Sequence, residues 1–186
     1  GRTDGKFEFF PRTTTRGDRF RYGFEAVYAY GPFGLYGEYV RSEEERKGLG
    51  TGGKDLDDVI GQGWYVAGSV LLTGENKVHG KAPKVKRNFD PRKGTFGAVE
   101  LAARFAQLDF DASDKLLPAT HPGPNRVDAF TAGINWYLSP NVRLMLNWTQ
   151  NWFENLAATP NTKSPDVSKR SDDTSWEILS RLALWF

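Results

Sequence analysis

Eight stretches of the chain alternate apolar and polar side chains at every second position, and most of them are about 9–13 residues long. The clearest is RFRYGFEAVYAY (19–30), in which Phe20, Phe24 and Tyr28 share one face and Arg19 and Glu25 share the other. A period of two is typical of a β-strand with one apolar face. Strands of soluble domains average about five or six residues, whereas a tilted membrane-spanning strand needs about 9–11. The pattern therefore predicts an all-β chain whose strands are long enough to cross a bilayer.

The other alternating stretches are distributed along the whole chain. Residues 97–110 contain good helix formers, but Val99, Leu101 and Phe105 follow a period of two, so a strand is predicted there as well. The remaining predicted strands are 6–12, 33–41, 62–73, 127–138, 142–152 and the last eleven residues.

The connections between these strands are expected to alternate in length. Links at 31–32 and 139–141 are short, and polar links at 42–61, 111–126 and 153–175 are long. Outer-membrane barrels have short turns at one end and long loops at the other. Segment 74–94 falls at the short-turn end although it is long and basic. It is either a structured loop at that end or a sign that a pair of strands has been misplaced.

Composition fits a barrel wall better than a packed core. Apolar residues make up 39% of the chain, below the usual value of about 45–50%, yet aromatic residues make up 14%. A thin lipid-facing surface with aromatic girdles and a polar interior has this composition. No run approaches the roughly 18 apolar residues of a transmembrane helix, so a helical membrane protein is excluded. The 186 residues are expected to form a single domain, 1–186.

Charge and cysteine content exclude several functions. A net charge of +2 is too small to predict a nucleic-acid partner. The absence of cysteine excludes disulfides, thiol catalysis and cysteine-ligated zinc. The chain begins without a basic and apolar leader, so a signal peptide is expected to be absent from this sequence.

The last residues, WEILSRLALWF, alternate up to a terminal aromatic residue. Trp176, Ile178, Leu182 and Leu184 share one face, as expected for a strand that pairs fully in lipid. The ending resembles the terminal assembly signal of bacterial outer-membrane proteins.

Longer blocks resemble one family. GFEAVYAYGPFGLYGEYV, GWYVAGSVLLTGE, AVELAARFAQLDF and GINWYLSPNVRLMLNW, in this order, are similar to the carboxy-terminal half of the phosphate-selective porin O and P family. The resemblance runs from about residue 19 to the end. It implies a sixteen-stranded barrel, usually trimeric, that passes anions across the outer membrane and is about twice as long as this chain.

The number of strands that close the barrel is left open. Eight strands can close a small barrel whose interior side chains just fill it. Small residues on the inward face favour instead half of a wider wall, because water fills the space that they leave. They are Gly23, Ala29, Ala98, Ala102, Ala129, Gly133 and Ala183.

Five arginines are predicted to face the interior: Arg19, Arg21, Arg104, Arg143 and Arg181. Arginines along a pore attract anions, and the planar guanidinium can bond two oxygens of a phosphate. Alternatively, these arginines pair with inward carboxylates and only stiffen the wall. The carboxylates are Glu25, Glu38, Glu100 and Glu177. Arg19 and Arg21 are the best anion candidates, because they face the same way on one strand.

Other polar clusters are interpreted as surface. A basic group in the long connection is expected to be a solvated loop or an anion-attracting vestibule: Lys77, Lys81, Lys84, Lys86, Arg87, Arg92 and Lys93. The only histidines, His79 and His121, lie in Gly/Pro-rich segments that do not favour a catalytic or zinc site. The acidic runs at 43–45 and 55–58 lack the calcium-loop pattern and are expected to be outer-loop surface.

These observations predict a wall of antiparallel transmembrane β-strands in a Gram-negative bacterial outer membrane. The expected function is passive diffusion of small anions, with phosphate or polyphosphate as the solutes that the family resemblance implies. The partners are then the lipid bilayer, small anions and two further copies in a homotrimer, with no nucleic acid, metal, cofactor or enzymatic step. The alternatives are a small closed outer-membrane barrel and a soluble β-sandwich binding module.

Overall fold

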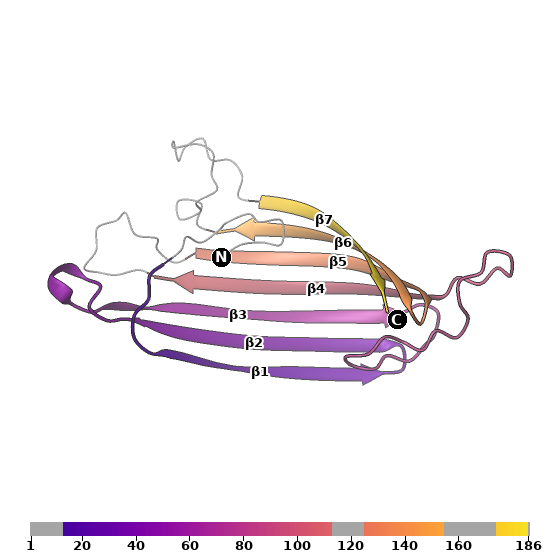
Figure 1. Cartoon of the computed structure of the whole chain (residues 1–186), viewed down its shortest axis with the longest axis horizontal. Helices are drawn as coiled ribbons and strands as arrows, with labels where there is room; N and C mark the ends of the chain where they lie inside the picture. Colours follow the sequence, from indigo (N-terminus) through magenta and orange to yellow (C-terminus); the bar gives the residue numbers. More distant parts are fainter. Residues whose placement is uncertain (1–12, 113–124, 155–173, 186) are drawn as a thin grey trace.

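The computed structural model describes residues 13–112, 125–154 and 174–185. In them the chain forms one seven-stranded antiparallel sheet, in which each strand is hydrogen bonded to its neighbours in sequence (Figure 1). The strands are β1 (Arg19–Tyr30), β2 (Phe33–Arg46), β3 (Leu56–Leu71), β4 (Ala98–Asp111), β5 (Asn125–Ser139), β6 (Val142–Phe153) and β7 (Thr174–Leu184). One 3-10 turn, η1 (Thr51–Gly53), lies between β2 and β3.

The alternating stretches predict these strands well. β1 has the predicted bounds, and the stretch with helix-forming residues is a strand, β4. The predicted strand at 6–12 lies outside the described residues, so the structure describes seven of the eight strands that were expected.

The prediction of a long loop over 42–61 is wrong at both of its ends. β2 continues to Arg46 and β3 begins at Leu56, so that Ser42 pairs with Gly61 and Glu44 pairs with Val59. The end of β2, SEEER (42–46), is polar, and the start of β3, LDDVIG (56–61), contains apolar residues that do not alternate with polar ones, so neither part was predicted as a strand. The backbone ladder continues because hydrogen bonds between strands do not depend on side-chain polarity.

The sheet has one apolar face and one polar face. Along the first face, Phe24 pairs with Tyr39 and Tyr39 with Trp64. Phe20 is 63% exposed, Ile134 45% and Leu184 52%, so these side chains do not converge in a shared interior. An apolar surface that covers most of one sheet face in this way needs an apolar environment or a partner.

The buried hydrophobic side chains of the described residues are few and lie on the opposite face, in two clusters. One contains Val59, Ala112, Val127 and Phe153, and the other contains Leu71, Ala98 and Tyr137. The described residues provide no second sheet to cover the apolar face, so they do not form the sandwich that was considered as an alternative. In the described part of the chain no helix is long and apolar enough to cross a bilayer.

The long basic connection joins β3 to β4 at the end of the sheet where the short turns 31–32 and 140–141 also lie. Its backbone is tied to its surroundings: Lys77 N donates to Gly31 O (2.7 Å) and Phe89 N donates to Leu138 O (2.7 Å). Segment 74–94 is therefore a structured loop, as the first of its two interpretations predicts, and it does not mark a misplaced pair of strands.

Candidate functional site

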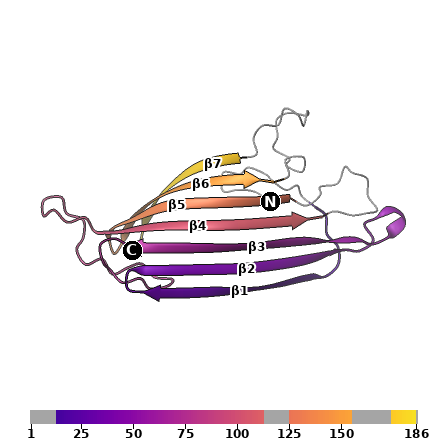
Figure 2. The ribbon, with the colours of Figure 1, turned by 180° about the vertical axis from the view of Figure 1, so that it is seen from behind.

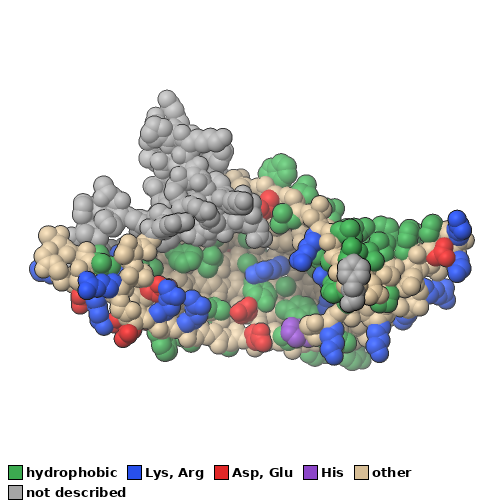
Figure 3. All heavy atoms as spheres, in the orientation of Figure 1, with side chains coloured by type: hydrophobic (Ala, Val, Ile, Leu, Met, Phe, Trp, Pro, Cys, Tyr) green, Lys and Arg blue, Asp and Glu red, His purple; other side chains and the backbone are tan. Residues whose placement is uncertain are grey.

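One face of the sheet lines a hollow of about 560 Å³ to which all seven strands contribute. The sheet curls from β1 to β7, as its two opposite views show (Figures 1 and 2). Most residues of the hollow belong to the polar face, which is therefore the concave face, and the apolar face is convex. Basic side chains are visible within the hollow (Figure 3).

The register places all five predicted arginines on the concave face. Arg21 is opposite Ser42 near the long-loop end, and Arg104 is opposite Ala67 near the middle of the wall. Arg181 and Arg143 are opposite Met145 and Ala183, closer to the short turns. Together with Arg19, these side chains are spaced along the strands from one end of the sheet to the other.

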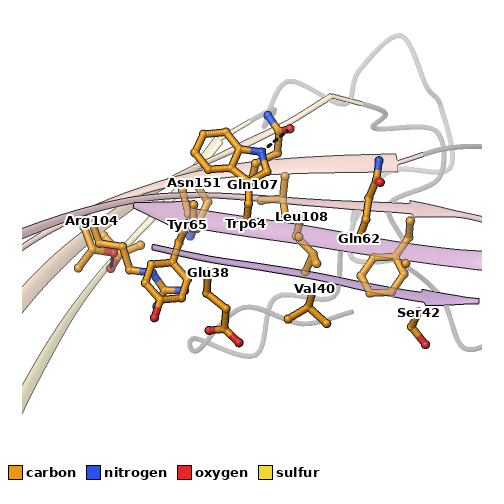
Figure 4. Close-up of a pocket in the computed structure, with 18 of the residues that line it drawn as sticks. Glu38, Val40, Ser42, Gln62, Trp64, Tyr65, Arg104, Gln107, Leu108 and Asn151 are labelled. Atoms are coloured by element: carbon orange, nitrogen blue, oxygen red, sulfur yellow. Dashed lines mark hydrogen bonds between the residues drawn. The ribbon is translucent and has the colours of Figure 1, made fainter. Parts of the chain in front are cut away.

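Aromatic rings hold two of these arginines. The guanidinium of Arg104 lies 4.1 Å from the centre of the Tyr65 ring, and the close-up of the hollow shows the two groups side by side (Figure 4). Arg143 lies 5.5 Å from the Tyr137 ring and 5.2 Å from the Trp185 ring. A cation over an aromatic face is attracted by the ring without losing its charge. Both arginines are therefore oriented by ring contacts.

The expected pairing of the arginines with Glu25, Glu38, Glu100 and Glu177 is not what the structure contains. Arg19 does form an ion pair, but with Glu44 (2.8 Å). Among the described residues, none of the other four arginines lies within ion-pair distance of an acidic side chain. The concave face therefore carries cationic groups that are not neutralised by its own carboxylates.

A second hollow, of about 550 Å³, lies between the 72–97 connection and the concave face. Lys77 reaches from the connection to Glu100 on β4 and forms an ion pair with its Oε1. The other oxygen of Glu100 accepts hydrogen bonds from Tyr137 Oη (3.0 Å) and Asn135 Nδ2 (3.2 Å). Burial alone would lower the pKa of Lys77, but the hydrogen bond and the charge of Glu100 outweigh burial and raise it. Lys77 thus fastens the connection to the wall as a charged group.

Within the part of the chain that the structure describes, His79 and the acidic runs do not form a metal-binding group. The ring of His79 packs against that of Tyr36 at 5.6 Å, and His121 lies outside the described residues. The described residues contain no group of three or more ligand-type side chains placed to hold a metal ion. The run at 43–45 lies in β2, and Asp57 and Asp58 lie in β3, which corrects their prediction as loop surface.

A family model, phosphate-selective porin O and P, matches residues 9–168. The chain belongs to this porin family. Membership in the porin family implies a channel of the outer membrane that passes phosphate, rather than an enzyme. No curated protein matches the chain closely enough to add a second comparison.

Periodicity assigned the five arginines of this porin to one face of the sheet, as the register does, but it did not predict the contacts of their side chains. Periodicity gives the face of each strand residue, whereas the stacking of Arg104 on Tyr65 depends on the side-chain conformations of two strands. The ion pair of Lys77 with Glu100 joins residues 23 positions apart. The signal that the sequence offers is that Glu100 is the one carboxylate on the inward face of β4.

Proposed function

We propose that this porin chain forms part of the wall of an outer-membrane pore through which small anions diffuse passively. One observation carries the proposal: the two faces of a single curled sheet differ in polarity. The convex face exposes aromatic and aliphatic side chains, as lipid requires, and on the concave face four of the five arginines have no carboxylate partner among the described residues. Phosphate and polyphosphate are the solutes that we expect on the basis of the family.

The proposed pathway follows Arg19, Arg21, Arg104, Arg181 and Arg143. Guanidinium groups spaced along a wet lumen replace part of the hydration of an anion as it moves from one to the next. A guanidinium can bond two phosphate oxygens at once, which a lysine ammonium does less well. Arg19 contributes least in this scheme, because Glu44 already neutralises it at 2.8 Å.

The proposed wall extends beyond the seven described strands. Within the described residues, β1 is hydrogen bonded only to β2 and β7 only to β6, so both outer edges have unpaired backbone groups. Lipid does not tolerate such edges, and closure therefore needs further strands. A sixteen-stranded barrel assembled as a trimer is the arrangement that we propose from the family. The mass of the intact polypeptide and cross-linking of the assembled protein test these two proposals.

Reversal potentials in planar bilayers test the role of the arginines. We expect the double variant Arg21→Ala and Arg104→Ala to lose a large part of its anion preference in a salt gradient. The matched control, Arg41→Ala with Arg126→Ala, removes the same charge from the convex face of the same sheet. It should conduct like the unmodified protein. An unchanged anion preference in the first variant would remove Arg21 and Arg104 from the pathway.

Competition between anions tests selectivity for phosphate. Chloride conductance is recorded while phosphate or a short polyphosphate is added to one side. A phosphate-selective pore should lose chloride current at low phosphate concentration, because bound phosphate occupies the arginine sites. If chloride current is unaffected, the pore is a general anion porin.

A further inference from the structure

A basic lobe, defined as residues 86–96 of the β3–β4 connection, lies at the short-turn end of the sheet. It is an ordered element rather than a free loop. Asp90 and Thr95 exchange two backbone hydrogen bonds (3.0 and 3.1 Å), and Thr95 Oγ1 donates to Asn88 O (2.6 Å). Figure 1 shows this connection projecting beyond the ends of the strands.

The root of the basic lobe is joined to the convex apolar face. Trp136, which is on that face of β5, donates a hydrogen bond from its Nε1 to Phe96 O (2.6 Å). The Phe89 ring meets the Trp136 ring edge-on at 5.2 Å. Phe96 itself is 67% exposed. Aromatic side chains therefore continue from the apolar face into the lobe, as they do where a protein passes through a membrane interface.

The outer part of the basic lobe is strongly cationic. It contains Arg87, Arg92 and Lys93 but only one acidic residue, Asp90, whereas Lys86 at the start of the lobe donates from its Nζ to Gly74 O (2.7 Å). Lys93 lies 3.5 Å from Asp90 with a side chain that is 79% exposed, and no described acidic residue pairs with Arg87 or Arg92. Figure 3 shows basic side chains gathered at the outer end of this projection. Cations are thus placed beyond the aromatic root, toward the outer end of the projection.

We propose that the basic lobe binds the headgroups of anionic phospholipids at the short-turn edge of the apolar face. The inference rests on the proposed function only in placing the convex face in lipid. Basic groups next to a bilayer surface attract anionic lipid, and aromatic rings set the depth at which they lie. A polyanion free in solution would explain the charges but not the exposed ring of Phe96. We therefore favour lipid over a soluble polyanion such as a cell-wall polymer.

Lipid enrichment tests the proposal directly. The protein is reconstituted in vesicles of phosphatidylethanolamine and phosphatidylglycerol, extracted with its lipid annulus, and the co-isolated lipids are quantified by mass spectrometry. The variant Arg87→Gln, Arg92→Gln and Lys93→Gln should retain at least about fivefold less phosphatidylglycerol than the unmodified protein. The control Arg16→Gln, Lys47→Gln and Lys54→Gln removes the same charge at the opposite end and should retain the normal amount. Phe96→Ser alone should lower the enrichment without changing the charge, and it serves if the triple variant does not fold.

Each result supports or overturns the lipid proposal. Equal enrichment in the lobe variant and the unmodified protein, or an equal loss in the control, would overturn it. If the lobe variant keeps its lipid enrichment but no longer binds isolated cell-wall polymer, the ligand of the basic lobe is that polymer and not lipid. Anion conductance of the same samples separates this proposal from the function of the pore. If the unmodified protein enriches phosphatidylglycerol but does not conduct anions, the lipid proposal holds and the proposed pathway is wrong. If it conducts anions but does not enrich phosphatidylglycerol, the pathway holds and the lipid proposal is wrong.

Discussion

Gly97 shows how a single residue determines where the long connection can enter the wall. Its φ is +73°, which is a left-handed conformation, and a Cβ built at this position would lie 2.2 Å from the carbonyl oxygen of Tyr137. A side chain would therefore meet both an unfavourable backbone conformation and the neighbouring strand. Only glycine lets the chain turn into β4 this close to β5.

We predict that Gly97→Ala destabilises the folded protein by about 2–3 kcal/mol, because both costs apply. Gly94→Ala is the matched control. Gly94 also has a positive φ (+65°), but no heavy atom lies within 4 Å of its added Cβ, so its cost should be about 1 kcal/mol. Urea unfolding in detergent, followed by the loss of β-structure in circular dichroism, measures both. Equal costs for the two variants would contradict the close approach at Gly97.

Arg104 offers a residue-scale test that separates charge from orientation. Arg104→Lys keeps the charge, but a lysine lacks the planar group that lies 4.1 Å from the Tyr65 ring. We predict that this variant keeps most of its anion preference over cations and loses part of its preference for phosphate over chloride. Bi-ionic reversal potentials measure both preferences. The control Arg126→Lys, on the convex face, should change neither, and a full loss of anion preference in Arg104→Lys would contradict the stacking role.

At the scale of whole elements, the sequence predicts a strand accurately where alternate residues of that strand contribute to the apolar face. β1 was predicted to its end residues because its six even positions from Phe20 to Tyr30 are all apolar. The end of β2 was missed because its outward Glu43 carries no apolar signal, and the start of β3 was missed because the adjacent apolar residues Val59 and Ile60 break the alternation. The Lys77–Glu100 pair was missed because the contact joins a loop to a strand, and periodicity gives only the face of a strand residue.

The β3–β4 connection depends on that ion pair for its position. We predict that Lys77→Met destabilises the protein by about 3 kcal/mol, because the nearly inaccessible Glu100 then loses its countercharge. Replacing both partners, as in Lys77→Met with Glu100→Gln, should cost less than the sum of the single changes. The control is Lys81→Met, an exposed lysine of the same connection. Urea unfolding midpoints of Lys77→Met, Glu100→Gln, the double variant and Lys81→Met measure these costs, and additive costs would show that the pair is not a coupled unit.

The pH dependence of this contribution has a defined direction. The pKa of Lys77 is raised above its ordinary value, so its charge stabilises the folded state fully at pH values below the unfolded pKa of about 10.5. The stabilisation is lost as pH rises through the higher folded pKa. The difference in unfolding free energy between the unmodified protein and Lys77→Met should therefore stay constant from pH 7 to about 10 and shrink at higher pH. A difference that shrinks between pH 7 and 9 would show that the lysine is not held in its charged form.

At the scale of the whole molecule, the fold works as a partition between two solvents. Most side chains that a soluble protein would bury are exposed here on the convex face, and the few buried ones lie in clusters on the concave face. This inversion is stable only if hydrocarbon covers the convex face and water fills the concave one. In the proposed pore, the same partition places the concave arginines on the water-filled side of the wall, where an anion pathway needs them.

Two tryptophans report the two sides of this partition. Trp148 is on the convex face and 41% exposed, whereas Trp185 lies beside Arg143, 5.2 Å from its guanidinium. In variants that keep only one of them, with the other tryptophans changed to phenylalanine, brominated lipid should quench Trp148 strongly and Trp185 weakly. Iodide in the aqueous phase should do the opposite, because the basic lumen concentrates anions around Trp185. If iodide quenches Trp148 and brominated lipid does not, the convex face is in water, and neither the pore nor the lipid contact of the basic lobe can hold.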